Sequence, residues 1–304
     1  MFITHAQDER QLSTLSILNT PLILSLSKEK LNDILQYRTL LINKNKMTTA
    51  TSTFFLFIIL SFIPLLSAAS TQEKPARIAI VIDDLGYRNT DQHALLLPGA
   101  ITYSILPHTP YGKTIAIQAN ANHKDVLLHI PMEAENGKKL GPGALTSTMN
   151  KTEVYNSLNE SLAEVPFAVG INNHMGSHLT QLADPMSWTM GFLKKHHLLF
   201  LDSKTSPYSK ASIIAKEMGV PVKGRHVFLD NQLTEQYINK QFQSLIKHAK
   251  TQHFAIAIAH PHPETIEALL RLIPTLQQNN IELVPLSTLY STPADNQMQL
   301  ANSE

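Results

Sequence analysis

The feature that most constrains the fold of this chain is a repeated alternation of short apolar runs with amphipathic segments between residues 77 and 290. Short β-branched apolar runs are typical of buried strands, and apolar residues spaced three and four apart are typical of helices. The predicted strands cover residues 78–82, 101–106, 125–130, 167–171, 198–202, 221–228, 254–259 and 281–284. The predicted helices cover residues 90–97, 111–121, 151–164, 185–197, 208–218, 234–250 and 263–279. This alternation predicts an α/β fold, and it favours a (β/α) barrel with seven or eight parallel strands over an open sheet.

Composition limits the classes of function that remain. The chain has 304 residues, of which 43% are apolar and 16% charged, and this is typical of a globular protein. The net charge is +1 and no basic run is interleaved with aromatic residues, so nothing indicates a nucleic-acid partner. No Gly-rich phosphate loop follows a predicted strand, which argues against nucleotide binding. Because the chain has no cysteine, any transition metal would be held by carboxylates and by some of the 14 histidines.

Residues 44–70 have the pattern of a secretory signal peptide. Lys44 and Lys46 form a positive flank, residues 54–66 form an apolar core, and the small residues 67–69 form a cleavage site. An uncleaved membrane anchor is the alternative, but this core is shorter than the roughly 20 residues that a spanning helix needs.

The signal divides the chain into five predicted parts. They are a non-native or unstructured extension at residues 1–46, a signal peptide at 47–69, a linker at 70–76, the barrel at 77–290 and a flexible tail at 291–304. We therefore expect a protein secreted across the inner membrane into the periplasm, with membrane contact only through an uncleaved signal.

Polar side chains follow most of the predicted strands. The carboxyl ends of barrel strands meet on one face, where active sites of such barrels lie. The polar strand ends contain Asp83 and Asp84, His108, His129 and Glu133, the run Asn172 to His178, Asp202 to Ser206, and His260 to Thr265. We expect these side chains to converge on a single site.

Asp83 and Asp84 directly follow the apolar run at residues 78–82. At a strand end two adjacent carboxylates can face one pocket, where one binds a cation and the other takes a proton. The simpler alternative is a turn in which Asp83 caps the next helix and Asp84 is solvated.

His174 and His178 are four residues apart, a spacing that places both imidazoles on the same side of a helical turn. One aspartate and two histidines with open water positions would suit a catalytic Zn²⁺ or a similar divalent ion. His260 would then protonate the leaving group. The alternative is a chance spacing in a chain rich in histidine.

Several of these segments together resemble a known family. They are Ile82 to Gly86, Pro131 to Glu133, Gly141 to Leu145, Asn172 to Ser177, Leu201 to Ser203 with Thr205 and Ser206, and His260 to Thr265. In this order they resemble the divergent polysaccharide deacetylase family, a remote branch of the carbohydrate esterase 4 superfamily. The resemblance covers about residues 76–290. It implies a distorted (β/α) barrel and metal-dependent deacetylation of a cell-envelope glycan.

The resemblance also assigns roles to single residues. It implies that Asp83 is the catalytic base, that Asp84, His174 and His178 are metal ligands, and that His260 is the acid. In the divergent branch the position of His178 is usually Lys or Arg. The alternative ligands are therefore His129, His262 and Asp202, and Asn173 is a further candidate for the site.

The sequence therefore leads to one main hypothesis. We expect a secreted hydrolase that uses a divalent metal ion, with zinc expected, to remove acetyl groups from a polysaccharide or a peptidoglycan-type glycan. A catalytically silent barrel that binds peptidoglycan or an envelope protein is the alternative. A metal hydrolase of another ester or of a phosphate is a third possibility.

Overall fold

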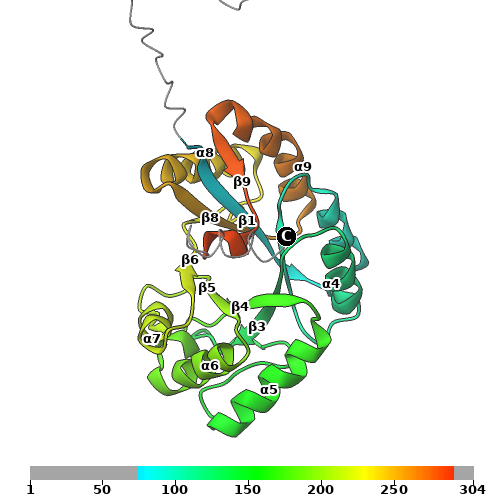
Figure 1. Ribbon diagram of the computed structural model, residues 1–304. Helices are drawn as coiled ribbons and strands as arrows, with labels where there is room; N and C mark the ends of the chain where they lie inside the picture. Colours follow the sequence, from blue (N-terminus) through cyan, green and yellow to red (C-terminus); the bar gives the residue numbers. More distant parts are fainter. Residues whose placement is uncertain (1–73, 291–304) are drawn as a thin grey trace, which may run out of the picture. The chain divides into compact units, whose positions relative to one another are not determined.

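The structure is a computed structural model that describes residues 74–290 of the chain. In these residues one sheet contains nine strands, and every pairing in it is parallel (Figure 1). The strands are β1 (Ala76–Leu85), β2 (Thr102–Ile105), β3 (Val126–Met132), β4 (Ala168–Met175), β5 (Leu199–Asp202), β6 (Val222–Gly224), β7 (Val227–Phe228), β8 (Phe254–Ala259) and β9 (Ile281–Leu283). The predicted α/β barrel is confirmed. The predicted extension, signal peptide and tail lie outside the described residues.

Helices surround the curled sheet. The α-helices are α4 (Gly112–Ala121), α5 (Lys151–Glu164), α6 (Ala183–Lys195), α7 (Ala211–Met218), α8 (Glu235–Gln252) and α9 (Pro263–Leu272). The 3-10 helices are η2 (Asn89–Leu96), η3 (Leu179–Gln181), η4 (Ile273–Asn279) and η5 (Leu286–Leu289). None of these helices is long and apolar enough to cross a membrane.

One predicted helix and one predicted strand are each divided into two elements in the structure. The single helix predicted at residues 263–279 becomes α9 and then η4, because Pro274 lacks the N–H that would continue an α-helix. The single strand predicted at 221–228 becomes β6 and β7, which pair with β5 and β8 respectively. The two strands are separated only by Arg225 and His226, so one short segment joins both edges of the sheet. This segment closes the barrel.

Side chains on each strand alternate between two apolar layers. On β1, Ile78, Ile80 and Ile82 belong to the larger core between the sheet and the helices, whereas Ala79 and Val81 belong to a second core inside the barrel. Alternation follows because successive side chains of a strand point to opposite faces. The inner core is small and closed off from water.

The last described residues close the barrel at the amino ends of its strands. Leu286 and Leu289 of η5 belong to the inner core. The Leu286 N–H donates to Thr102 Oγ1 at 3.2 Å, and the Tyr290 hydroxyl donates to the Phe200 carbonyl at 3.0 Å. This plug leaves the carboxyl ends of the strands as the open end.

We expect Leu286→Ala to lower the free energy of unfolding by about 2–5 kcal/mol, because it leaves a cavity in the inner core. Urea denaturation of the variant and the wild type measures the difference. Leu96→Ala is the matched control: its side chain is 71% exposed, so a change within about 0.5 kcal/mol is expected. Equal losses in the two variants would mean that η5 is not a stabilising plug.

Candidate active site

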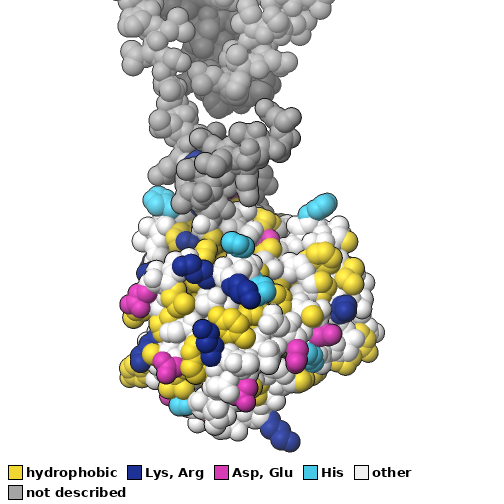
Figure 2. Space-filling model, turned by 60° about the horizontal axis from the view of Figure 1, so that its bottom comes forward, with side chains coloured by type: hydrophobic (Ala, Val, Ile, Leu, Met, Phe, Trp, Pro, Cys, Tyr) yellow, Lys and Arg dark blue, Asp and Glu magenta, His cyan; other side chains and the backbone are white. Residues whose placement is uncertain are grey.

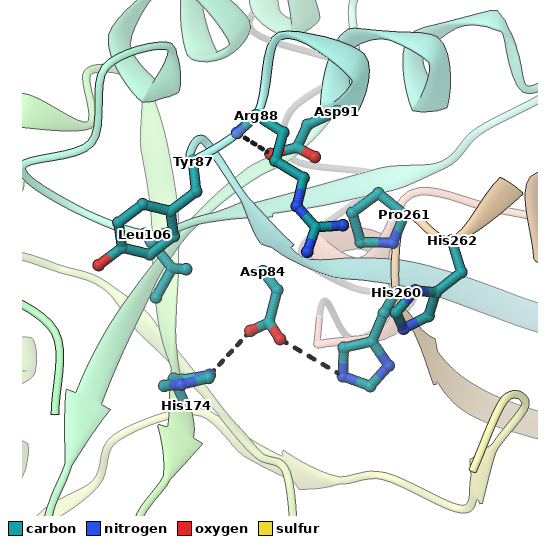
Figure 3. Close-up of a pocket in the computed structure, with 9 residues that line it drawn as sticks. All are labelled: Asp84, Tyr87, Arg88, Asp91, Leu106, His174, His260, Pro261 and His262. Carbon is teal, nitrogen blue, oxygen red and sulfur yellow. Dashed lines mark hydrogen bonds and ion pairs between the residues drawn. The ribbon is translucent and has the colours of Figure 1, made fainter. Parts of the chain in front are cut away.

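A cavity of about 320 Å³ lies at the carboxyl ends of the strands (Figure 3). It is lined by Asp84, Tyr87, Arg88, Asp91, Leu106, His174, His260, Pro261 and His262. Figure 3 shows that Asp84 lies between His174 and His260, with the Arg88 side chain reaching toward the same space. Residues from three distant parts of the chain therefore meet here, as the strand ends predicted.

Strand alternation explains why polar groups gather at this level of the barrel. Val81, Leu127 and Ile258 lie in the inner core. Two residues further along the chain come Asp83, His129 and His260, the last of them directly after β8, and these side chains therefore lie one layer higher. Asp83 and His129 are each only 2% exposed. The apolar floor of the barrel is thus followed by a polar layer.

Asp84 leaves the regular strand geometry. Its backbone has a φ of 61°, which turns its side chain toward neighbouring strands. Asp84 Oδ1 lies 3.0 Å from His129 Nε2 and 2.7 Å from His174 Nδ1. Burial alone would raise the pKa of Asp84, but hydrogen bonds with the two histidines hold that pKa well below its ordinary value. Asp84 is therefore a carboxylate at neutral pH.

The chain that follows Asp84 is held in place by a buried carboxylate. The Asp91 side chain accepts hydrogen bonds from the N–H groups of Gly86 at 3.0 Å and Arg88 at 2.9 Å. Gly86 has a φ of 127°, and a side chain at this position would collide with Thr109. This turn explains the glycine in the sequence motif and fixes the direction in which the strand ends.

Asn172 connects the buried members of the site, a role that the sequence analysis missed. Its amide nitrogen donates to both carboxylate oxygens of Asp83, at 2.9 and 3.1 Å. Its oxygen accepts from the Ser104 hydroxyl and lies 2.9 Å from His129 Nδ1. The His129 nitrogen facing this acceptor must carry a proton, which leaves Nε2 directed at Asp84.

Burial and charge set the protonation of the two groups that Asn172 joins. Burial raises the pKa of Asp83 above its ordinary value, despite the nearby histidines. Burial alone would lower the pKa of His129, but the carboxylates of Asp83 and Asp84 raise it. Asp83 is thus a stronger base than an exposed aspartate.

His260 is paired with Asp230, which the sequence analysis also missed. His260 Nδ1 lies 3.0 Å from Asp230 Oδ1, and the His260 N–H donates to Asp230 Oδ2 at 2.7 Å. The Thr265 hydroxyl donates to the same carboxylate at 3.0 Å. Burial lowers the pKa of His260, but the hydrogen bond and charge of Asp230 outweigh it and raise this pKa to about 9. Asp230 lies two residues after the strand predicted at residues 221–228, so the strand-end pattern could have identified it.

Three donors lie close enough together to bind one metal ion. Asp84, His129 and His174 each offer one ligand atom, and these atoms lie within 4.8 Å of one another. Because His129 Nδ1 faces Asn172, Nε2, which lies 3.0 Å from Asp84 Oδ1, is the nitrogen that can act as a ligand. Two imidazoles and one carboxylate are a donor set that suits Zn²⁺ with an open position. The side chains present therefore fit a catalytic divalent cation.

Other predicted site residues lie at or near this group with different contacts. His178 is not part of it: its Nε2 faces Glu133 at 4.0 Å, and its side chain is 39% exposed. His262 lines the cavity, with its ring 6.1 Å from that of His260. Asn173 accepts from the Ser203 N–H at 2.9 Å and so joins two strand ends.

Asp202 does not line the cavity that contains Asp84. It is buried, and its carboxylate accepts from the Lys204 N–H and from the Ser209 hydroxyl, each at 2.8 Å. These bonds shape the loop after β5. Its contacts are those of a loop-stabilising residue.

The sequence and the fold were also compared with those of known proteins. The sequence profile of the family described as divergent polysaccharide deacetylase matches residues 80–290. The uncharacterized protein YibQ of Escherichia coli (strain K12) is 37% identical over 236 residues, which cover 77% of this chain and 73% of YibQ. An uncharacterized protein of Haemophilus influenzae is 38% identical over 218 residues, which cover 71% of this chain and 77% of that protein.

A solved structure matches the barrel itself. The crystal structure of the uncharacterized protein ATU2773 from Agrobacterium tumefaciens C58 gives a TM-score of 0.69 at 26% sequence identity. The match covers 72% of this chain and 91% of that one. The fold comparison thus covers a share of the chain similar to the shares that the sequence comparisons cover.

The His260–Asp230 pair predicts a measurable titration. In metal-free protein the His260 ring should lose its proton near pH 9, because Asp230 stabilises the cation. Asp230→Asn removes that charge, so the pKa should fall toward the ordinary value of about 6.5. NMR titration of the imidazole measures both values. Asp184→Asn, on the exposed first turn of α6, is the control and should leave the titration unchanged. A His260 pKa near 6.5 in the wild type would contradict the pairing.

Proposed function

The chain belongs to the divergent polysaccharide deacetylase family, and from this we propose that it is a metal-dependent deacetylase of an acetylated cell-envelope glycan. One observation carries the proposal. Three side chains that could together hold one metal ion lie beside a buried carboxylate and a cationic imidazole, at the open end of the barrel. Metal-dependent hydrolysis of an amide or ester uses these three components together: a cation, a base and an acid.

The proposed ligands are Asp84, His129 and His174. A divalent cation bound by them, with zinc as the expected one, would acidify a bound water and stabilise the negative charge that develops on the acetyl oxygen. The role of the three side chains is to hold the positive charge of the cation at one position. Asn172 supports that role because it orients the His129 ring.

Asp83 is the proposed general base. Its Oδ2 lies 3.7 Å from His129 Nε2, so the carboxylate is adjacent to the proposed ligands. Because burial raises its pKa, Asp83 accepts a proton from the attacking water more readily than an exposed aspartate does. The two bonds from Asn172 fix the direction of the carboxylate.

His260 is the proposed general acid. Its Nε2 lies 3.9 Å from Asp84 Oδ2, which places the ring on the other side of the proposed metal site from His174. With a pKa of about 9 the ring is protonated at neutral pH and can donate its proton to the departing amine or alcohol. Together the base and the acid complete the hydrolysis to acetate and a free amino or hydroxyl group.

The proposed substrate and location follow from the family and from the leader at residues 47–69. A protein exported across the inner membrane meets acetylated glycans such as peptidoglycan in the periplasm. The cavity of about 320 Å³ would accept one acetylated sugar unit, since small-molecule sites begin at about this size.

The first prediction of this proposal concerns metal content. Protein beginning at Ser70, purified without a metal-binding tag, should contain about one divalent ion per chain by mass spectrometry. Asp84→Asn and His129→Ala should each lose the ion, because each removes a ligand. His178→Ala is the matched control and should retain it, because His178 faces Glu133. Loss of the metal in His178→Ala but not in His129→Ala would refute the proposed ligand set.

The second prediction concerns catalysis. Asp83→Asn should keep its metal ion but release acetate from acetylated chitooligosaccharide or peptidoglycan about 10²–10⁴-fold more slowly, because it removes the base. Asp184→Asn is the control and should match the wild type. A metal-loaded wild type that releases no acetate from any acetylated glycan would instead favour a silent glycan-binding barrel.

A further inference from the structure

The barrel has a seam where its closing segment changes partner. β7 pairs with Ala257 and Ile258, so the first half of β8 has no strand partner on that side. His226 bridges part of this gap: its N–H donates to the Ile256 carbonyl at 2.9 Å, and its Nδ1 accepts from the Ile256 N–H at 3.0 Å. No helix intervenes between β6 and β7 to cover the seam from outside.

A cavity of about 790 Å³ opens along this seam, and we call it the seam groove. Its walls include Lys204, Lys216, Lys223, Ser206, Ser212 and His226. It shares no lining residue with the cavity that contains Asp84. The groove is thus distinct from the candidate active site.

The fold holds two of the three lysines in defined positions. Lys204 has a φ of 50°, its N–H donates to Asp202 Oδ1, and its aliphatic stem lies across Gly224, where any side chain would collide with it. Lys223 is half-buried, with its Nζ 4.4 Å from the centre of the Phe254 ring. Contacts with the fold therefore position Lys204 and Lys223 at the groove.

The charge of the groove is not balanced within the described part of the chain. No carboxylate of residues 74–290 forms an ion pair with Lys204, Lys216 or Lys223. Asp202 is the one carboxylate in the lining, and it already accepts two hydrogen bonds. Burial, followed by repulsion from Arg77, lowers the pKa of Lys223. On the face in Figure 2, several Lys and Arg side chains lie near the middle and others lie at the edges, where most Asp and Glu side chains also lie.

We propose that the seam groove binds the phosphate group of a phosphorylated sugar. Three ammonium groups match a phosphate monoester, which carries a charge of about −1.5 to −2 at pH 7, better than a single carboxylate. The hydroxyls of Ser206 and Ser212 line the groove as hydrogen-bond donors. Tyr208 lies in the chain between the lining residues Pro207 and Ser209 and is 74% exposed, so its ring is accessible for stacking on a bound sugar. The volume lies within the range of small-molecule sites, about 300–1,000 Å³.

The test is isothermal titration of metal-free protein with N-acetylglucosamine 6-phosphate, which avoids an anion bound to metal at Asp84. We expect binding to be tighter than that of inorganic phosphate and absent for uncharged N-acetylglucosamine. Lys204→Gln/Lys216→Gln should weaken it about tenfold or more, since each exposed ion pair contributes up to about a factor of five. Lys113→Gln, on α4, removes an exposed lysine elsewhere and should have no effect.

A second variant keeps the charge and changes the position. Gly224→Ala should displace the Lys204 stem and weaken binding, with its melting temperature showing that the barrel is intact. Amide shifts on titration should map to Ser212 and Gly224. Binding that is lost in His174→Ala but kept in the lysine variants would place the anion in the other cavity and overturn the proposal.

Two further outcomes would also overturn it. Binding of phosphatidylglycerol vesicles without binding of the sugar phosphate would assign the groove to a lipid surface. Sugar phosphate binding that appears only after removal of residues 291–304 would assign it to the chain's own tail, which contains Asp295. Neither outcome depends on whether the protein is a deacetylase.

Discussion

The hydrogen bonds of Asn172 are the interaction on which the rest of the candidate site depends. One buried amide donates to Asp83 and accepts from Ser104 and His129. Without it, a buried carboxylate and a buried imidazole would each lose a partner, and an unsatisfied buried polar group costs about 1–3 kcal/mol, or more when charged. The same bonds decide which nitrogen of His129 faces Asp84. One side chain therefore contributes both to stability and to the tautomer of His129.

This hydrogen-bond network is possible because the interior of the barrel has an apolar layer and, above it, a polar layer. Below it, the inner core and the η5 plug exclude water with side chains such as Val81 and Leu286. Above it, the same strands present charged groups to an open cavity. Charges at the upper boundary of an apolar core interact more strongly than charges in water. The raised pKa values of Asp83 and His129 are consequences of this position.

Much of this arrangement could be predicted from the sequence, because strand–helix alternation and polar strand ends are local patterns. The parallel barrel and the convergence of Asp84, His129, His174 and His260 follow from them. The division of residues 221–228 into β6 and β7 could not be predicted, because a change of the strand with which a segment pairs does not alter its apolar sequence pattern. The supporting role of Asn172 was missed because it is set by contacts with residues far along the chain, whereas Asp230 was missed although it lies near the end of a predicted strand.

The spacing of His174 and His178 shows that residue spacing alone does not predict a metal site, because the backbone conformation decides where the two side chains point. A spacing of four residues places two side chains on one side of a helix, but His174 belongs to the extended end of β4. Met175 and Gly176 then have φ values of 55° and 89°, which turn the chain away before His178. The second histidine in the group of candidate metal ligands comes instead from β3: it is His129, whose ring contacts that of His174.

The most direct test of this account is the position of the metal ion. A crystal soaked in zinc and measured at the zinc absorption edge should show one anomalous peak within about 2.0–2.2 Å of Asp84 Oδ1, His129 Nε2 and His174 Nδ1. His178 should remain near Glu133. A peak coordinated by His174 and His178, or none at the carboxyl ends of the strands, would contradict the site described above.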